Sequence, residues 1–547
     1  MKKLYIAALF AIASTIASAQ FTKIFDFSGA ADGNQPYGAL ISDGTFLYGM
    51  TYIGGANNDG VIFKIKTDGT GYVDLFDFSG AADGKSPRGS LISDGTYLYG
   101  TTRYGGASND GVIFKIKPDG TGYTKLFEFN GTDGLQPLGS LIYDGNFLYG
   151  TTEQGGTSAK CVNGCGVAFR IKPDGTGDTT LLDFSTGGVT AMNPYGSLVS
   201  DGTFLYGMTR DGGVSNYGVI FKIKPDGTGY TDLLDFAGTA NGRNPDGSLI
   251  LNGGFLYGMT QLGGTNNVGT IFRIKPDGTG DTILFNFSGA ANGSNTHSSL
   301  IYDGNFLFGM AYQGGSSGVG TMFKIKPNGI GYTKLSDFAG AANGSNPQGD
   351  LFSDGSTLYG MTYGGGINAM GTVFKYQYCT MISDSLTISP PNCGSNNGSV
   401  TVLPSGGAGN YTYKWNNGDS TATVSGLSGS PTDTLVVKIT DSNGCFHIDT
   451  TRVSCLTGIT QITNINSEIF VYPNPSYGKF IFESGIENQE LGIKIYNMLG
   501  KEVYSQHSIH SSQFEIDLSN QPAGIYLYRI LSEKGEYVAS GKVVTEK

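Results

Sequence analysis

The chain has 547 residues, a formal charge of −11 and 88 glycines, and only 14% of its residues are charged. Its length exceeds that of one ordinary hydrophobic core, so we expect about two to four domains. An acidic chain of this kind is a poor partner for nucleic acid or anionic membrane surfaces. Glycines among aromatic and β-branched runs predict an all-β protein with short strands and tight turns.

Residues 1–19 have the pattern of a secretory signal peptide. Lys2 and Lys3 precede an apolar stretch, and small residues end at Ala19. Cleavage is expected between Ala19 and Gln20. The apolar run is too short for a membrane anchor, because a spanning helix needs about 20 residues. We therefore expect an exported protein.

Residues 20–378 are dominated by internal repeats. The phrase SDGTFLYGMT returns with small changes seven times, starting at Ser42, Ser93, Tyr143, Ser200, Leu251, Tyr302 and Ser353. A period near 50 residues with four strand-like runs predicts the blade of a β-propeller, of kelch-like length, rather than a helical solenoid. In the first copy the runs are residues 38–41, 45–51, 60–66 and 72–78. Asp-Gly pairs between them supply the positive φ that tight hairpins require.

The count of strands predicts a closed ring. The first three strands occur seven times, but the fourth strand is missing after the last copy, which ends at Tyr378. A matching strand, FTKIFDF at residues 21–27, stands at the start of the mature chain instead. Because an N-terminal strand that completes the last blade closes a propeller and removes its edges, we expect seven blades.

The loops between the second and third strands vary among the copies, and we assign any binding to their face. They include residues 56–59, 107–110, 214–217 and 367–370. The longest, in the third copy, contains Cys161 and Cys165. In an exported chain these predict a disulfide, whereas a zinc site would need two further ligands.

Two kinds of side chain recur in every copy, and we interpret both as structural. Mid-strand tyrosines are expected to pack between blades, with sugar stacking as the alternative; they are Tyr48, Tyr99, Tyr149, Tyr206, Tyr257 and Tyr359. Fourth-strand carboxylates are expected to pair across strands with third-strand cations. The carboxylates are Asp26, Asp77, Glu128, Asp183, Asp235 and Asp337, and the cations are Lys64, Lys115, Arg170, Lys222, Arg273, Lys324 and Lys375.

No catalytic, cofactor-binding or metal-ligating residues are predicted. The chain lacks a nucleophile elbow, an HExxH motif and a phosphate loop, and the repeats contain a single histidine, His297. Calcium at the inter-blade loops, through Asp32 and Asp83, is an alternative, although the loops lack the ligand ladder of a calcium motif.

The repeat LYGMTxxGGxxxxGxIFKIKPDGTGYTxLxxF resembles the GloVer tandem repeat of secreted bacterial proteins with interchangeable C-terminal anchors. The resemblance covers about 360 residues and implies no settled biochemical activity.

Residues 379–457 lack the repeat and resemble the SprB-type repeat of Bacteroidota surface proteins, on residues that include Cys393, Tyr413, Trp415 and Cys445. The resemblance implies a small immunoglobulin-like β-sandwich in which Trp415 is a core residue; sugar stacking by Trp415 is the alternative. The suggested disulfides are Cys393–Cys445 and Cys379–Cys455, although six cysteines allow fifteen pairings.

After a linker at residues 458–467, residues 468–547 resemble the type A C-terminal sorting domain of the type IX secretion system, a second small β-sandwich. Its motif is Tyr472-Pro473-Asn474-Pro475, followed by IKIYNMLGKEVY and a closing GKVV. The resemblance implies the type IX secretion machinery as partner, and release from the cell or attachment to its surface.

Together these features predict a secreted or surface-attached, monomeric, non-enzymatic binding or adhesion protein. Its propeller loops would present weak sites to a glycan or protein ligand. The alternatives are a secreted glycosidase or lyase on a propeller scaffold and a passive spacer. An enzyme is expected to show one deep acidic cluster where blades differ, a lectin repeated equivalent pockets, and a spacer neither.

Overall fold

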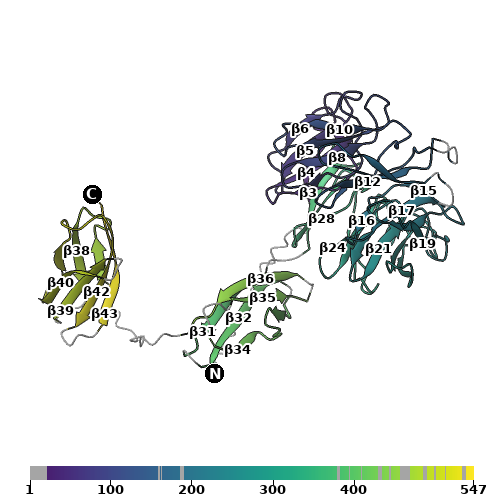
Figure 1. Cartoon of the computed structure of the whole chain (residues 1–547). Helices are drawn as coiled ribbons and strands as arrows, with labels where there is room; N and C mark the ends of the chain where they lie inside the picture. The colour runs from purple at the N-terminus through teal and green to yellow at the C-terminus, as the bar shows by residue number, and fades with distance from the viewer. Residues whose placement is uncertain are drawn as a thin grey trace, which may run out of the picture. The chain divides into compact units, whose positions relative to one another are not determined.

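A computed structural model describes the chain from residue 21 to 546 (Figure 1). It omits residues 158–160, 162, 185, 187–189, 379–381, 393–394, 408, 429–433, 443–444, 456–468, 485–489, 498–500, 512 and 533–536. The expected signal peptide with Ala19 and Gln20, the linker, Cys379 and Cys393 therefore lie outside the described residues. Within these limits all regular structure is β-strand, and no helix has the length and hydrophobicity of a membrane span.

Between residues 21 and 378 the described strands form seven antiparallel sheets, one for each sequence repeat. Six are continuous in sequence: β2 to β6 (Asn34–Pro36, Ile41–Ser42, Phe46–Ile53, Val61–Lys66, Val73–Asp77), β7 to β10 (Ile92–Ser93, Leu98–Thr102, Val112–Ile116, Thr124–Glu128), β11 to β14 (Ile142–Tyr143, Leu148–Thr152, Val167–Ile171, Thr179–Asp183), β15 to β19 (Ala191–Pro194, Val199–Ser200, Leu205–Gly212, Val219–Ile223, Thr231–Asp235), β20 to β23 (Ile250–Asn252, Phe255–Thr260, Thr270–Ile274, Thr282–Asn286) and β24 to β27 (Ile301–Tyr302, Leu307–Ala311, Thr321–Ile325, Thr333–Asp337). We number these repeats 1 to 6.

The seventh sheet joins the two ends of the repeat region. Its order is β1-β30-β29-β28, with β1 at Phe21–Asp26, β28 at Phe352–Ser353, β29 at Thr357–Thr362 and β30 at Thr372–Gln377. Phe21 lies opposite Tyr376, and Asp26 lies opposite Thr372. The expected pairing of the N-terminal strand with the last repeat is confirmed.

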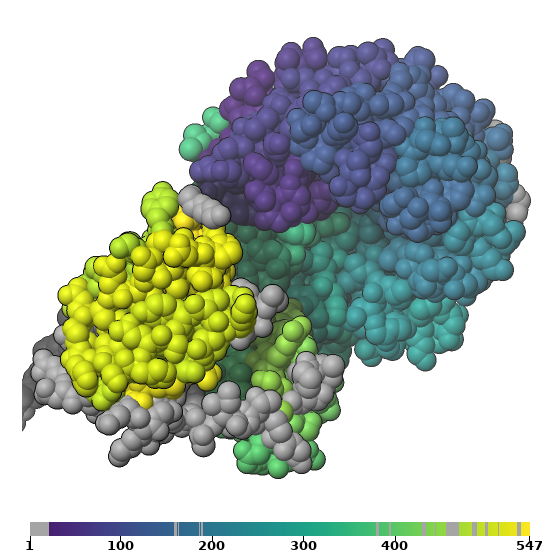
Figure 2. Space-filling model, turned by 60° about the vertical axis from the view of Figure 1, so that its left-hand side comes forward, coloured from purple at the N-terminus to yellow at the C-terminus, as the bar shows by residue number. Residues whose placement is uncertain are grey.

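Among the described residues of the repeat region, the core is divided among seven clusters of buried residues, and each cluster is shared by two consecutive repeats. One of them packs Phe63 and Leu47 of repeat 1 against Tyr359 and Val373 of repeat 7. The series of contacts between consecutive repeats thus also joins repeat 7 to repeat 1. In Figure 2 the colour passes gradually from purple through blue to teal across this region, so neighbours in sequence are neighbours in space.

Within a repeat, an Asp-Gly turn and a glycine hold the second strand in place. The Asp43 carboxylate accepts the N–H groups of Thr45 and Phe46, and Gly44 takes a φ of 90°. Tyr48 is buried and donates its hydroxyl to Asp43 at 2.7 Å. A Cβ on Gly49 would lie 2.7 Å from the Phe63 ring, so only glycine leaves room for that ring. The tyrosine expectation, packing rather than sugar stacking, is confirmed.

The expected cross-strand charge pairs are wrong. A β-bulge between Ile62 and Phe63 sets the register, and Asp77 faces Val61 rather than Lys64. The Asp77 carboxylate accepts the Ala56 N–H at 2.7 Å and so closes the variable loop of its own repeat. Lys64 instead donates to the Pro118 carbonyl of the next repeat at 3.2 Å.

This lysine contact also runs from the last repeat to the first, because Lys375 donates to the Thr67 carbonyl at 3.4 Å. Where a carboxylate of the fourth strand does meet a cation, the cation lies three residues earlier on the same strand. Lys23 is 2.8 Å from Asp26, and Lys334 is 2.8 Å from Asp337.

Consecutive repeats touch most closely along one four-residue segment, x-Gly-Ser-Leu, which directly precedes the short strand that begins at Ile41 in repeat 1. Ala39 replaces the serine in repeat 1, Ser298 the glycine in repeat 6, and Asp350 the serine in repeat 7. A Cβ on its glycine would lie between 2.2 and 2.7 Å from a carbonyl oxygen of the following repeat, at Gly38, Gly89, Gly139, Gly196, Gly247 and Gly349. The next residue donates its N–H to the serine hydroxyl of the following repeat at 2.7–2.8 Å, from Ala39, Ser90, Ser140, Ser197 and Ser248 in turn. Ser299 donates likewise to the Asp350 carboxylate.

Carboxylates in the loops between repeats accept hydrogen bonds from the same loops. Asp32 accepts the Ser28 N–H and, at 2.8 Å, the Ser28 hydroxyl, so its two oxygens close the loop. Asn241 accepts the equivalent N–H in a later repeat, where an amide replaces the carboxylate. No group of three or more His, Cys, Asp or Glu among the described residues is placed to hold a metal ion.

Beside the first of these loops, Asp74 on β6 has a raised pKa. Burial raises it to about 6, and the neighbouring Asp77 and Asp32 charges add to the effect. Its Oδ1 atom is buried without a hydrogen-bond partner among the described residues. Asp74 therefore opposes folding when it is ionised.

Residues 382–452 form two three-stranded sheets, which are β31 (Ile382–Ser389), β32 (Gly398–Gly406) and β34 (Thr423–Leu427), and β33 (Thr412–Trp415), β35 (Thr434–Thr440) and β36 (Phe446–Arg452). Trp415 is buried and donates its indole N–H to the Thr421 carbonyl at 2.9 Å. The expectation of a core tryptophan is confirmed. Cys445 and Cys455 are both disulfide-bonded, and their connectivity stays a prediction.

The C-terminal part contains a three-stranded sheet, β37 (Ile469–Tyr472), β38 (Lys479–Ser484) and β41 (Gln513–Asp517), and a four-stranded sheet. The latter consists of β39 (Leu491–Asn497), β40 (Glu502–Ile509), β42 (Gly524–Ser532) and β43 (Tyr537–Thr545). One apolar cluster joins them, in which Phe480 and Ile516 of the first sheet pack with Ile493 and Ile530 of the second.

The junction of repeats 7 and 1 generates the first prediction. Ala39 stands where the other repeats place a serine or aspartate, so the Asp350 N–H meets no side-chain oxygen there. We expect Ala39→Ser to complete the series of hydrogen bonds and to raise the free energy of unfolding by about 0.5–1.5 kcal/mol. Urea unfolding of the full chain measures the change, with Ala82→Ser on an exposed loop as control. Equal stability of the two variants would contradict the proposed geometry.

The second prediction concerns pH. A carboxyl whose folded pKa of about 6 exceeds its unfolded value of 3.8 destabilises the fold increasingly as pH rises through that interval. We expect Asp74→Asn to raise the unfolding temperature at pH values above about 6 and to have little effect below about 4. Asp68→Asn should act in the opposite direction near neutral pH, because hydrogen bonds from Thr70 lower the pKa of Asp68. A gain for Asp74→Asn that is independent of pH would show that the carboxylate charge is not the cause.

Candidate functional site

A cavity of about 70 Å³ is lined by the x-Gly-Ser-Leu segments of all seven repeats, and we call it the shared cavity. Its wall is nearly uniform where glycine and serine contribute. The first residue of the segment varies among the repeats, and in order these residues are Tyr37, Arg88, Leu138, Tyr195, Asp246, His297 and Gln348. The repeats therefore differ where they meet around the cavity.

A second position varies in the same way and lies directly after the second-strand motif. In order its residues are Tyr52, Arg103, Glu153, Arg210, Gln261, Tyr312 and Tyr363. Several of them contact residues of the first series. Tyr52 and Tyr363 pack against Tyr37 with ring centroids 5.3 and 5.2 Å away, and Tyr312 packs against His297 at 4.9 Å.

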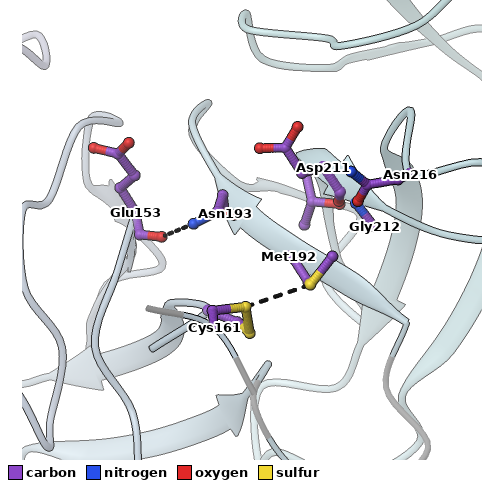
Figure 3. Close-up of a disulfide and its surroundings, with 9 residues drawn as sticks. Glu153, Cys161, Met192, Asn193, Asp211, Gly212 and Asn216 are labelled. Atoms are coloured by element: carbon purple, nitrogen blue, oxygen red, sulfur yellow. Dashed lines mark hydrogen bonds between the residues drawn. A yellow bond between two sulfur atoms is a disulfide. The ribbon is translucent and has the colours of Figure 1, made fainter. Parts of the chain in front are cut away.

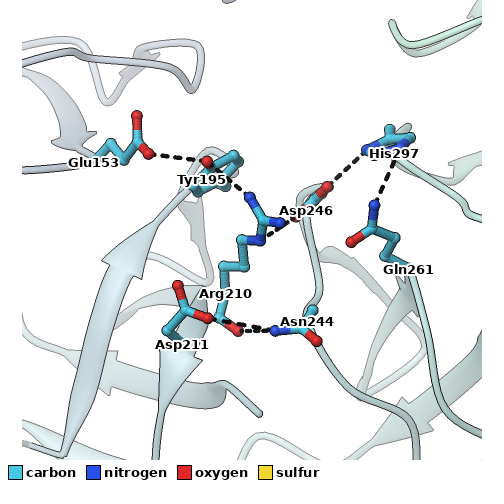
Figure 4. Close-up of polar contacts among 8 residues, drawn as sticks. All are labelled: Glu153, Tyr195, Arg210, Asp211, Asn244, Asp246, Gln261 and His297. Carbon is cyan, nitrogen blue, oxygen red and sulfur yellow. Dashed lines mark hydrogen bonds and ion pairs between the residues drawn. The ribbon is translucent and has the colours of Figure 1, made fainter. Parts of the chain in front are cut away.

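The charged members of the two series form one polar network (Figure 4). The Tyr195 hydroxyl donates to Glu153 at 2.9 Å and accepts from Arg210 at 2.9 Å. The Arg210 Nε atom lies 3.7 Å from Asp246. Glu153 also contacts Arg103 at 3.3 Å. Each of the two carboxylates thus has an arginine beside it.

The network continues from Asp246 to His297. The His297 Nδ1 atom is 2.6 Å from Asp246, and its Nε2 atom is 3.3 Å from the Gln261 side-chain nitrogen. A neutral imidazole with its proton on Nδ1 satisfies both contacts, since Nε2 then accepts from the amide. His297 is thereby held in one orientation at the cavity.

The surroundings raise the pKa values of the two arginines and of Tyr195 in this network. Burial alone would lower the pKa of Arg210, but Asp246 and Tyr195 raise it overall, and Arg103 behaves in the same way beside Tyr104 and Glu153. Burial raises the pKa of Tyr195, and Glu153 adds to the rise. Near neutral pH the arginines are therefore charged and the tyrosine hydroxyl remains a donor.

The disulfide loop of repeat 3 supports one end of the network (Figure 3). Cys161 and Cys165 are bonded, as predicted, with Cα atoms 5.3 Å apart, and Cys161 lies 3.4 Å from the Met192 sulfur. The Asn193 N–H donates to the Cys165 carbonyl at 2.8 Å, and its side chain donates to the Glu153 carbonyl at 3.0 Å. Asn193 thus connects the disulfide loop to the backbone of Glu153.

None of the residues around the shared cavity was predicted as a site. The sequence placed binding on the variable loops, but several loop side chains turn inward to hold their own backbone. Asn57, for example, donates to the Phe78 carbonyl at 3.0 Å. An available signal was the divergence of single positions in near-identical repeats, at Arg88, Glu153, Asp246 and their equivalents.

The predicted sorting motif lies in the C-terminal part. Asn474 donates to the Lys542 carbonyl at 2.9 Å and accepts the Val544 N–H at 2.8 Å, which ties the motif to β43. Tyr472 contacts Glu483 at 2.9 Å. Pro473 and Pro475 line a surface hollow of about 580 Å³ together with Tyr477.

Three known sequence families match the chain. The Gloeobacter/Verrucomicrobia repeat matches residues 8–162 and 156–374, the SprB repeat matches residues 385–420, and the secretion system C-terminal sorting domain matches residues 470–546. The sorting domain is that of the type IX system, so the protein is exported to the cell surface or beyond it, with the secretion machinery as a partner. No curated protein matches the chain.

Several solved structures share a distant likeness with the chain. PorZ, a surface component of the type IX secretion system of Porphyromonas gingivalis, is 14% identical over 93% of this chain and 75% of PorZ, with a TM-score of 0.29. The GH74 enzyme of Niastella koreensis is 14% identical over 94% of this chain and 80% of the enzyme, with a TM-score of 0.41. The tricorn protease is 11% identical with a TM-score of 0.34, and the chain covers only 53% of its length.

These structural likenesses are too weak to transfer an activity. The sequence match to the repeat is different in kind, because it spans more than half of the chain. The chain belongs to the Gloeobacter/Verrucomicrobia repeat family.

Proposed function

We propose that this exported protein is a non-enzymatic surface binding or adhesion protein, and that it takes a glycan ligand at the shared cavity of a seven-bladed β-propeller. The observation that carries the proposal is the divergence of the repeats around this cavity. Repeats that are otherwise nearly identical place a different side chain there in almost every copy.

The contacts between repeats support a closed propeller. Seven sheets share seven core clusters, and one cluster joins repeat 7 to repeat 1. The Lys375 contact with Thr67 and the approach of Gly349 to Gly38 join the same two repeats. A closed ring leaves no sheet edge of the repeat array free to pair with another chain, which suits a monomeric exported protein.

The side chains favour one asymmetric site over seven weak equivalent ones. Tyr37, Tyr52, Tyr312 and Tyr363 supply aromatic surface with a polar end, whereas repeats 2 to 5 supply charged and amide groups. Aromatic surface beside hydrogen-bonding groups of fixed direction suits a saccharide, which offers both apolar ring faces and hydroxyl groups. One chain would then bind one ligand, unlike the multivalent arrangement expected from the sequence.

The size of the cavity favours binding over catalysis. Ligand pockets commonly measure about 300–1,000 Å³, so a cavity of about 70 Å³ is too small to enclose a sugar ring. The ligand would lie across the opening and place a small group inside. Such an arrangement recognises a ligand but does not surround a glycosidic bond.

A polysaccharide-active enzyme is the second candidate, because two buried carboxylates, Glu153 and Asp246, belong to the same network. Glycosidases use a pair of carboxyl groups in different protonation states. Here an arginine lies beside each carboxylate, 3.3 Å from Glu153 and 3.7 Å from Asp246. This arrangement suits structural ion pairs better than a general acid.

The third prediction tests binding. We expect the purified mature chain to retain a subset of glycans on an array without releasing products, and Tyr37→Ala to weaken binding at least about tenfold through loss of the aromatic surface at the opening. Tyr143→Ala, at an Asp-Gly turn, is the matched control and should bind normally. Affinity is measured by titration, and turnover by chromatography of the supernatant.

Release of shortened saccharides that depends on Glu153 or Asp246 would replace the proposal with the enzymatic one. Binding that survives Tyr37→Ala but not changes in the variable loops would move the site to those loops. Dependence on added calcium would support the alternative in which the inter-repeat loops around Asp32 bind calcium.

A further inference from the structure

Arg88 differs from the arginines of the neighbouring polar network in having no acidic partner among the described residues. Arg103 and Arg210 lie beside Glu153 and Asp246. Arg88 has no ion pair or side-chain hydrogen bond to any of the described residues, although it lines the cavity and is half-buried. An arginine that is partly removed from water normally has a hydrogen-bonded anion beside it.

Aromatic rings hold the Arg88 guanidinium in place. Its central carbon lies 4.7 Å from the centre of the Tyr37 ring and 5.3 Å from that of Tyr195. Stacking of this kind uses the faces of the planar group and leaves its N–H groups along the edge free. The edge of a guanidinium matches the two oxygens of a carboxylate, which it binds through parallel hydrogen bonds.

Asp246 offers a complementary group in the same cavity. Its side chain is 5% exposed, and its Oδ1 atom is buried without a hydrogen bond from any described residue; the nearest cation, Arg210 Nε, is 3.7 Å away. A buried carboxylate oxygen of this kind is costly unless a donor reaches it. A ligand hydroxyl is such a donor.

We propose that the shared cavity binds an acidic saccharide, a uronate, whose carboxylate enters the cavity and pairs with Arg88 while a hydroxyl group donates to Asp246. This inference rests on the proposed glycan-binding function and names the class of glycan. A carboxylate fits a cavity of about 70 Å³, whereas the sugar ring stays outside against Tyr37 and its neighbouring tyrosines. Because Arg88 occurs in one repeat only, each chain binds one such group.

The test compares short oligomers of galacturonate, guluronate, mannuronate and glucuronate with the same oligomers after reduction of their carboxyl groups, by calorimetric titration of the mature chain. We expect at least one acid to bind, with loss of roughly 10- to 100-fold in affinity on reduction, the usual effect of a hydrogen-bonded charge. Binding of the acid should weaken as salt is added.

Variants locate the effect. Arg88→Gln should reproduce the loss for the acid and leave the reduced oligomer unaffected, and Arg88→Lys should restore part of the affinity through its charge. Lys117→Gln, which removes the same charge from an exposed turn, should bind as the unaltered chain does. If Arg88→Gln does not fold, the comparison of acid and reduced oligomer on the unaltered chain still decides the question.

The outcomes separate the inference from the function on which it rests. Equal affinity for acid and reduced oligomers, binding of neutral or sulfated glycans only, or an acid effect that persists in Arg88→Gln would overturn the uronate inference and leave a glycan-binding protein. Failure of every saccharide to bind would overturn both.

Discussion

The structure depends on the close approach of backbones between consecutive repeats. At the x-Gly-Ser-Leu segment the glycine of one repeat lies so near a carbonyl of the next that no Cβ fits, and a serine accepts the neighbouring N–H. Larger residues here would force the repeats apart. Since the core clusters are themselves shared between repeats, wider spacing would open the core as well.

The same constraint explains where the repeats are free to differ. Glycine and serine make this contact in most repeats, and the Phe63 ring and its equivalents require Gly49 and its equivalents. The first residue of the segment lines the cavity instead and varies among the repeats. At His297 the pattern itself changes, because Ser298 replaces glycine and hydrogen-bonds to Met310. The site thus lies at positions where the fold accepts different side chains.

Much of the fold could be predicted from the sequence, because the same pattern of strands occurs in seven copies. The pairing of β1 with β30 followed from counting the strands of each repeat. The disulfide followed from the expected export of the chain and from the short spacing of Cys161 and Cys165. The charge contacts could not be predicted in this way. The alternation of Lys64 and Asp77 in their strands gives no hint of the bulge between Ile62 and Phe63 that separates them.

The candidate site was harder to predict for a different reason. Arg88, Tyr195, Arg210 and Asp246 come from several repeats, and their meeting depends on how each sheet is turned relative to the next. The sequence of a single repeat does not determine how its sheet is rotated relative to the next sheet. A comparison of the seven copies with one another would have marked the varying positions but not their partners.

The split seventh sheet has a consequence for export. In a chain that emerges from a translocation pore with its N-terminus first, β1 appears before its partner β30, which follows more than three hundred residues later. During that interval the hydrogen-bonding edge of β1 has no partner of its own and can pair with other extended segments. Contacts between such distant segments also form slowly. The edge of β1 is therefore covered only when the last repeat has arrived.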